Sequence, residues 1–132
     1  MNPFEFFIPQ NITVGAGTLA KLPECAKKLG GSHAMLISGS TLRKMGVVDK
    51  AADYLKDAGM AVDIFTDVEA NPSVTTVEKA TEAYKDSGAD FIVALGGGSP
   101  MDVAKAVGVT AKYGGSITEY EGHIRFPEKL FR

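Results

Sequence analysis

Three short apolar runs recur along the chain, and each is followed by a segment whose apolar residues have helical spacing. The runs are 34–38 (AMLIS), 61–65 (AVDIF) and 90–95 (DFIVAL). The helical spacing follows over 47–58, 74–84 and 103–108. Short strands that alternate with helices in this way predict βαβ units and a parallel sheet.

Gly59 and Gly88 indicate where two of these helices end. Each follows a Lys-Asp pair, in LKDAGM (55–60) and YKDSGAD (84–90), and can adopt the positive φ that ends a helix. Because such crossovers are right-handed, we expect the carboxyl ends of all three strands at one edge, where open sheets bind ligands. The predicted fold class is α/β: one domain over 1–132, an open, mainly parallel Rossmann-like sheet with helices on both faces.

The first thirty residues have a different pattern. Residues 6–14 (FFIPQNITV) are expected to form short extended pieces broken by Pro9, and residues 17–30 are expected to form a helix. The apolar stripe of that helix consists of Leu19, Leu22, Cys25, Ala26 and Leu29. On this stripe Cys25 is interpreted as a small core residue, not as a nucleophile.

Composition narrows the class of protein. The 132 residues are 45% hydrophobic and 23% charged with a net charge of −2, which suits one globular domain without an electrostatic footprint for nucleic acid or an anionic membrane. The single cysteine has no partner for an internal disulfide. The start MNPFEFFIPQ lacks the pattern of a signal peptide, and no apolar run approaches the roughly 20 residues of a membrane span. We therefore expect a cytoplasmic protein.

Three adjacent glycines, Gly96, Gly97 and Gly98, stand between the third strand and the following helix. Ser99 suits the N-cap, Pro100 suits the first helical position, and Ser99 with Asp102 forms an S-x-x-D capping pattern. A capped turn would need one glycine, whereas three leave bare N–H groups at a helix N-terminus. Such groups bind phosphate, so we predict a pyrophosphate site here.

Three further features of the sequence bear on the predicted pyrophosphate site. Asp102 would repel a pyrophosphate unless it points toward the cap or toward a ribose hydroxyl, and Lys105 fits a phosphate contact and a solvated lysine equally well. GAGTLA (15–20) matches the dinucleotide pattern G-x-G-x-x-A, but 31–48 contains no acidic residue to complete it. We interpret this second motif as a helix-entry turn.

GGGSPMDVAKAVG resembles the G-G-G-S-x-x-D-x-A-K signature of the iron-containing (group III) alcohol dehydrogenases. The opening FFIPQNITVGAGTLAKL is similar to their F-x-x-P…G-x-G…L pattern, and LRKMGVVDKAADYLKDAGM is similar to their first crossover. VEANPSV (68–74) resembles their V-x-x-N-P segment. The similarity extends over residues 4–122.

The resemblance implies an NAD(P)-binding α/β half, followed in longer family members by a helical half in which an Asp and three His hold a divalent metal, iron or zinc. It implies that the backbone at Gly97, Gly98 and Ser99 holds the pyrophosphate and that Asp102 contacts the cofactor beside it. It places Asn71 near the adenosine end of the cofactor.

Gly39 departs from the family, which often has there an Asp that accepts a hydrogen bond from the ribose 2′-OH. Such a carboxylate would repel a 2′-phosphate. Gly39 leaves room for one, with Ser40 and Thr41 as donors and Arg43 and Lys44 close in sequence. We predict that NADP is accepted as well as NAD, unless Gly39 is simply a turn glycine. The candidate cofactor-binding residues are Gly39, Ser40, Thr41, Asn71, Gly96, Gly97, Gly98, Ser99 and Asp102.

The length is a second departure from the family. The chain stops at HIRFPEKLFR, before the family's P-T-T stretch and metal-binding half, so we expect the truncated amino-terminal half of a longer enzyme. His33 and His123 lie far apart in sequence and no carboxylate cluster supports them, so we expect surface or hydrogen-bonded histidines and no metal site. The missing half would leave apolar surface exposed, so we expect the end segment either to pair with another copy or to remain disordered. The resemblance also implies that the amino-terminal extended segment joins neighbouring subunits, which is consistent with a homodimer. The apolar residues of that segment are Ile124, Phe126, Leu130 and Phe131.

The resemblance implies hydride transfer between a primary alcohol or aldehyde and nicotinamide, with the metal as a Lewis acid on the alcohol oxygen. This chain would bind and orient the cofactor and would be inactive alone. The alternative hypothesis is a free-standing nucleotide-binding or regulatory α/β module without catalysis. A phosphoacceptor receiver domain is excluded, because it needs an Asp at the end of the third strand, where this chain has Leu95 and Gly96.

Overall fold

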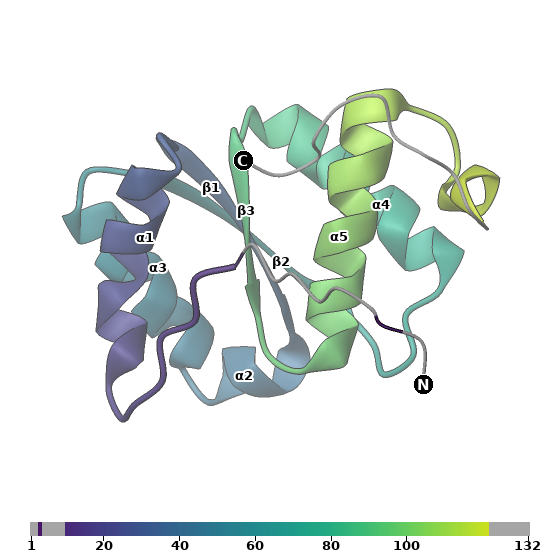
Figure 1. The fold of residues 1–132 in the computed structure, drawn as a ribbon. Helices are drawn as coiled ribbons and strands as arrows, with labels where there is room; N and C mark the ends of the chain where they lie inside the picture. The colour runs from purple at the N-terminus through teal and green to yellow at the C-terminus, as the bar shows by residue number, and fades with distance from the viewer. Residues whose placement is uncertain (1–2, 4–9, 122–132) are drawn as a thin grey trace.

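A parallel three-stranded sheet forms the centre of the protein in a computed structural model that describes residue 3 and residues 10–121 (Figure 1). The strands are β1 (His33–Gly39), β2 (Ala61–Val68) and β3 (Phe91–Leu95). Their order is β2-β1-β3, and β1 pairs in parallel with both neighbours. All three predicted strands and their parallel arrangement are confirmed.

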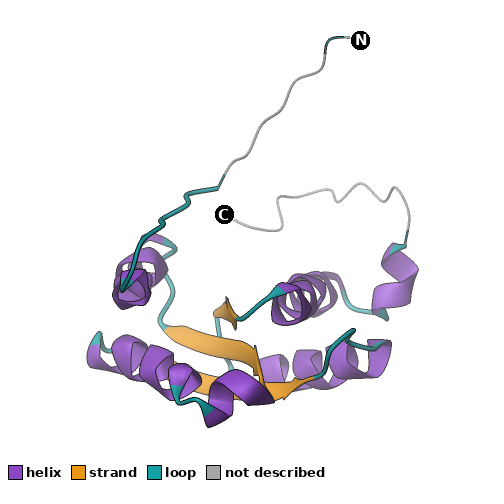
Figure 2. Ribbon diagram, turned by 90° about the horizontal axis from the view of Figure 1, so that it is seen from below, coloured by secondary structure: helices purple, strands orange, loops and turns teal. Residues whose placement is uncertain are grey.

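The helices lie on both sides of the sheet, with the strands between them (Figure 2). In chain order they are η1 (Thr18–Lys21), α1 (Leu22–Lys28), α2 (Ser40–Lys44), α3 (Val47–Asp57), α4 (Val74–Ser87), α5 (Gly98–Tyr113) and η2 (Ile117–Tyr120). Three of the four predicted helices correspond to α3, α4 and α5, and the fourth, predicted over 17–30, is divided into η1 and α1. The short α2 was not predicted, since its sequence STLRK has no apolar periodicity.

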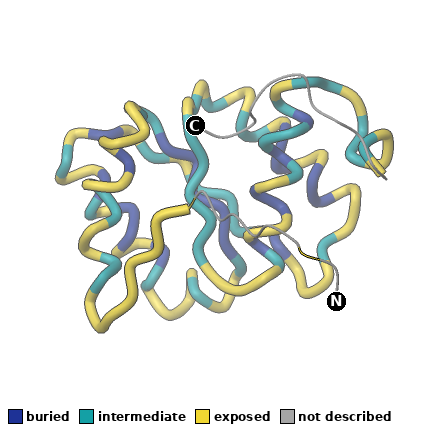
Figure 3. Tube along the Cα trace, viewed as in Figure 1, coloured by how far each residue is buried: buried dark blue, intermediate teal, exposed yellow. Residues whose placement is uncertain are grey.

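Alternate residues of β1 face two separate layers of the core. Met35 and Ile37 pack with α4 and α5, whereas Leu36 packs with α3 on the other face of the sheet. Residues 34–38 are all buried, and dark blue segments in Figure 3 follow β1 and the helix sides that face it. A strand covered on both faces is expected to be continuously apolar, as AMLIS nearly is.

The two predicted helix ends are confirmed. Gly59 follows α3 with φ 85°, and Gly88 is the C-cap of α4 with φ 74°. Both glycines adopt the left-handed conformation that terminates a helix before the chain enters the next strand.

The interpretation of Cys25 as a core residue is wrong, because its side chain is exposed. Ala26 is buried, but Leu29, which follows the last residue of α1, is 59% exposed. The segment is not one continuous α-helix: η1 is a 3₁₀ turn with about 3.0 residues per turn, so it changes which positions share a face with those of α1. Cys25 also lies about 100° around the helix from the buried Ala26.

Some predictions fall on residues outside the described part of the chain. These are the extended pieces at 6–9, His123 and the apolar residues Ile124, Phe126, Leu130 and Phe131. Residues 10–14 are described and contain no strand. No helix within the described ranges has the length and apolar character needed to span a membrane.

Candidate functional site

Three loops lie at one edge of the sheet, where β1, β2 and β3 end. We call this the carboxyl edge. It carries the start of α2 at 39–41, the turn at 69–73 and the glycine loop at 96–98 (Figure 1). The chain leaves β1 for β2 on one side and then returns to β3 on the other side. This reversal creates a switch point between β1 and β3, which is where open α/β sheets bind ligands.

Ser38 joins the ends of β1 and β3 at this switch point. It pairs with Leu95 in the sheet, and its buried Oγ donates a hydrogen bond to the Leu95 carbonyl at 2.7 Å. Gly39, the last residue of β1, and Gly96, the first residue after β3, follow directly. The bond therefore fixes the start of the glycine loop beside the start of α2, and the Cβ position of Gly96 lies 3.6 Å from Leu42 Cδ1.

The three glycines of the loop have different structural requirements. Gly96 has φ 138°, and a Cβ there would lie 2.8 Å from Pro100 Cγ, so the turn needs glycine at this position. Gly97 has φ −84°, Gly98 is the first residue of α5, and a Cβ at either would meet no atom within 4 Å. The fold itself requires one glycine, and the other two keep the N-terminus of α5 uncovered.

The predicted N-cap is wrong. The N-cap of α5 is Gly97, not Ser99, and no side chain caps the helix; Asp102 lies beyond the first turn and is exposed. Pro100 falls at the third helical position, where its missing N–H costs no helical hydrogen bond, so the helix is free to begin before it. The consequence for a ligand is favourable, because no side-chain oxygen occupies the first N–H groups of α5.

The start of α2 presents small polar groups beside this loop. Gly39 is its N-cap with φ −98° and ψ 164°, and Ser40 and Thr41 are exposed in its first turn. Arg43 forms an ion pair with Asp49 of α3, with 3.1 Å between Nη1 and Oδ1. Lys44 is exposed at the end of α2. The structure thus brings Gly39, Ser40 and Thr41 to the predicted edge, but it directs Arg43 toward Asp49.

Asn71 lies in the 69–73 turn at the same edge. It is exposed and has φ 55°, and the turn begins directly after Val68, which pairs with Gly39. Sequence reasoning missed Glu69, whose side chain bonds to residues further along this turn and in α4. Ser73 before an apolar helical pattern indicates the N-cap of α4, but no local sequence signal indicates the role of Glu69.

The opposite edge of the sheet has a structural cluster of its own. His33 Nε2 lies 2.6 Å from Asp63 Oδ2, which confirms the prediction of a hydrogen-bonded histidine. The Asp90 carboxylate accepts hydrogen bonds from Ser32 N, Ser32 Oγ and His33 N. These bonds, with that from His33 N the largest cause, lower the pKa of Asp90. This cluster connects the beginnings of β1 and β3 and lies away from the glycine loop.

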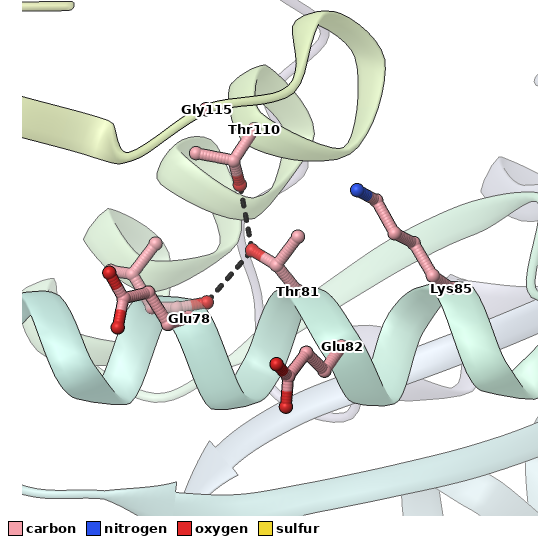
Figure 4. A pocket seen from close by; sticks show the side chains of 7 residues that line it. Glu78, Thr81, Glu82, Lys85, Thr110 and Gly115 are labelled. Atoms are coloured by element: carbon pink, nitrogen blue, oxygen red, sulfur yellow. Dashed lines mark hydrogen bonds between the residues drawn. The ribbon is translucent and has the colours of Figure 1, made fainter. Parts of the chain in front are cut away.

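A small hollow lies between α4 and α5 (Figure 4). Its volume is about 170 Å³, and its lining combines Glu78, Glu82 and Lys85 with two buried threonines. The threonines, Thr81 and Thr110, bond to each other at 2.7 Å between their hydroxyl oxygens. None of the predicted cofactor-binding residues lines it. Over the described ranges, no group of three His, Cys, Asp or Glu lies close enough to hold a metal ion.

Comparison with known proteins gives a family match over most of the chain. The model of the family described as iron-containing alcohol dehydrogenase matches residues 9–130. An NADPH-dependent butanol dehydrogenase of Clostridium saccharobutylicum is 44% identical over 103 residues, which cover 77% of this chain and 26% of that protein. The match confirms the resemblance drawn from GGGSPMDVAKAVG.

Solved structures show the same fold. A crystal structure of 1,3-propanediol oxidoreductase superposes with a TM-score of 0.87 at 36% identity, covering 92% of this chain and 32% of that one. Sulfoacetaldehyde reductase from Bifidobacterium kashiwanohense, solved in complex with NAD+, superposes with a TM-score of 0.84 at 28% identity, covering 95% of this chain and 33% of that one. The chain spans between 25% and 31% of the length of the curated relatives it matches.

Proposed function

The chain belongs to the family of iron-containing alcohol dehydrogenases, and on that premise we propose that it binds an NAD(P) dinucleotide at its carboxyl edge. In this proposal it is the cofactor-binding part of a metal-dependent enzyme that transfers hydride between a primary alcohol or aldehyde and nicotinamide. The dinucleotide, when bound, accepts or supplies that hydride. The residues of this chain bind and orient it, and the metal ligands belong to the rest of the enzyme.

The proposal rests on the empty space beside the backbone of Gly97 and Gly98. Neither residue has a positive φ, and a Cβ at either would meet nothing within 4 Å, so folding gives no reason for glycine at these positions. A ligand that approaches the backbone of the loop gives one. The uncapped start of α5 adds unsatisfied N–H groups and a partial positive charge of about half a unit, which suit a pyrophosphate.

The adenosine end of the cofactor is assigned to the edge between Gly39 and Asn71. Gly39 has an extended backbone with φ −98°, so the turn does not require glycine, and this weakens its interpretation as a simple turn residue. Ser40 and Thr41 are exposed donors beside it. Arg43 is paired with Asp49, and Lys44 is exposed at the end of α2, so both remain candidate cations for a 2′-phosphate. We expect NADP to be accepted as well as NAD.

Fluorescence titration with NADPH tests the proposed site through two substitutions that the fold tolerates. Gly97→Ala and Gly98→Ala each place a methyl group where the pyrophosphate would approach. Overpacking of this kind costs about 1–3 kcal/mol, so we expect NADPH affinity to fall about tenfold or more. The melting temperature without ligand should not fall, because neither methyl group meets protein atoms.

Lys85→Ala, near the far end of α4, is the matched control and should bind NADPH as the unsubstituted chain does. Undiminished affinity in both glycine variants would overturn the assignment of the pyrophosphate to this loop. Failure of the unsubstituted chain to bind either NADPH or NADH would overturn the proposed function itself.

A further inference from the structure

The turn of residues 69–73 is closed by hydrogen bonds to one carboxylate. Glu69 Oε1 accepts a hydrogen bond from Ser73 N at 3.0 Å and another from Thr76 Oγ1 at 2.5 Å. Ser73 Oγ in turn accepts one from Thr76 N at 3.2 Å and so caps α4. We call Glu69, Ser73 and Thr76 the Glu69 clasp. The hydroxyl of Thr76 and the amide of Ser73 lower the pKa of Glu69 to about 2, so its carboxylate is ionised near neutral pH.

Asn71 lies inside this closed turn in a conformation that its sequence context opposes. Among the described residues it is the sole non-glycine residue with a positive φ, 55°. The left-handed conformation costs an L-residue on the order of 1 kcal/mol, although Asn tolerates it better than most. The following residue is Pro72, and a proline biases the residue before it toward extended backbone. A backbone conformation that local preferences oppose must be stabilised by contacts with other residues. The Glu69 clasp can supply them, because Glu69 precedes Asn71 and its bonding partners Ser73 and Thr76 follow it.

The clasp is anchored in the body of the domain. Thr76 is 6% exposed in the first turn of α4, and Val68, immediately before Glu69, is buried and pairs with Gly39 of β1. Asn71 itself is exposed at the carboxyl edge. The hydrogen bonds therefore connect the residue after a buried strand end with the first turn of α4, and the exposed Asn71 lies in the turn between them.

We propose that Glu69 and Thr76 are positioning residues that hold Asn71 in its left-handed conformation and thereby shape the surface that receives the adenosine portion of the dinucleotide. This inference rests on the proposed function and adds residues that do not themselves touch the cofactor. Their contribution to binding passes through Asn71.

The test is a double-substitution cycle on NADPH affinity, measured by fluorescence titration of the 132-residue chain. Glu69→Ala and Thr76→Val each remove hydrogen bonds of the clasp, and we expect each to weaken NADPH binding about fivefold, the equivalent of one hydrogen bond. Glu69→Gln and Thr76→Ser keep an acceptor and a hydroxyl at the same places, and they should retain most of the affinity. These two conservative variants serve as matched controls.

The cycle then repeats Glu69→Ala and Thr76→Val in an Asn71→Ala background. If the clasp acts through Asn71, neither substitution weakens NADPH binding further in that background. A general loss of structure would weaken binding equally in both backgrounds, and that result would overturn the inference, as would unchanged affinity in the single variants. Thr76→Val provides the test if Glu69→Ala does not fold. If the unsubstituted chain binds no dinucleotide, the proposed function fails and this inference fails with it.

Discussion

In the proposed site, Gly39 occupies the position at which one carboxylate would decide between two dinucleotides. Its backbone is extended with φ −98°, and a Cβ at this position would lie 3.4 Å from the Val68 carbonyl oxygen, which is ordinary van der Waals contact. An L-residue therefore fits here without rearrangement of the turn. The structural cost of introducing a carboxylate is small, so a change in cofactor preference would report on its charge.

Gly39→Asp is expected to shift preference from NADPH toward NADH. The new carboxylate would repel a 2′-phosphate and accept a hydrogen bond from an unmodified ribose hydroxyl, and one charge contact of this kind changes an affinity ratio by about tenfold. Parallel titrations with NADPH and NADH give the ratio. Gly39→Asn has the same size without the charge and is the control. An equal ratio in the Asp and Asn variants would show that no 2′-phosphate lies near residue 39.

The sequence predicts a residue's role well where that role depends on its own backbone preference. It predicts the role poorly where it depends on where a helix begins or on which side of the helix the residue lies. Gly59 and Gly88 follow from a local preference for positive φ. Ser99 and Gly97 are both competent N-caps, and the choice between them depends on the turn at Gly96, which the sequence does not specify. Cys25 was assigned to the core by assuming one continuous helix, whereas a 3₁₀ turn precedes α1.

At the scale of elements, the sequence predicts the three strands and the helices that separate them because apolar runs and helical spacing are local signals. The place of the glycine loop at the carboxyl edge also follows, since the loop comes directly after a predicted strand. The switch point does not, because it depends on the strand order β2-β1-β3, which no local signal specifies. The contacts that hold the loops depend on tertiary geometry. The bond from Ser38 Oγ to the Leu95 carbonyl joins residues 57 positions apart, and the bonds of Glu69 depend on the path of the 69–73 turn.

The pairing of β1 with β3 is reinforced at its beginning by Asp90. Its carboxylate accepts hydrogen bonds from Ser32 N, Ser32 Oγ and His33 N at 2.7–3.1 Å, which lower its pKa below the ordinary 3.8. Asp90→Asn removes the charge and turns part of the acceptor into a donor. Because the site is exposed, we expect a loss of about 1 kcal/mol in the free energy of unfolding, seen as a lower urea midpoint at neutral pH.

The pH dependence of the loss in unfolding free energy shows whether the charge of Asp90 or only the shape of its side chain stabilises the fold. A carboxyl group whose pKa is lowered by folding stabilises the fold above its ordinary pKa and loses this contribution as pH falls through the lower folded value. The difference between unsubstituted chain and Asp90→Asn should therefore be constant above about pH 5 and shrink below pH 3.8. Asp86→Asn, on the exposed side of α4, should show no such difference. A difference independent of pH would mean that the charge of Asp90 contributes nothing.

At the scale of the whole molecule, the sheet order β2-β1-β3 gathers the three loops of the proposed binding site at one edge, and hydrogen bonds of Asp90 hold the beginnings of β1 and β3 together at the opposite edge. In our proposal the first edge binds the cofactor and the second stabilises the fold. Our proposal assigns cofactor binding to this chain and alcohol activation to the rest of the enzyme. Binding and turnover should then be separable properties of this chain.

We expect the 132-residue chain to bind NADPH without catalysing alcohol oxidation. Hydride transfer in a metal-dependent alcohol dehydrogenase requires a polarised alcohol oxygen as well as a positioned nicotinamide, and the chain spans at most 31% of the length of the curated relatives. Reduced nicotinamide should not accumulate when the chain is incubated with NADP, a divalent metal and a primary alcohol. The fluorescence titration with NADPH in the same buffer serves as the positive control for a folded site. If the chain oxidised the alcohol and Gly97→Ala abolished this activity, the prediction that binding and turnover are separable would be contradicted. Alcohol activation would then also lie within these 132 residues.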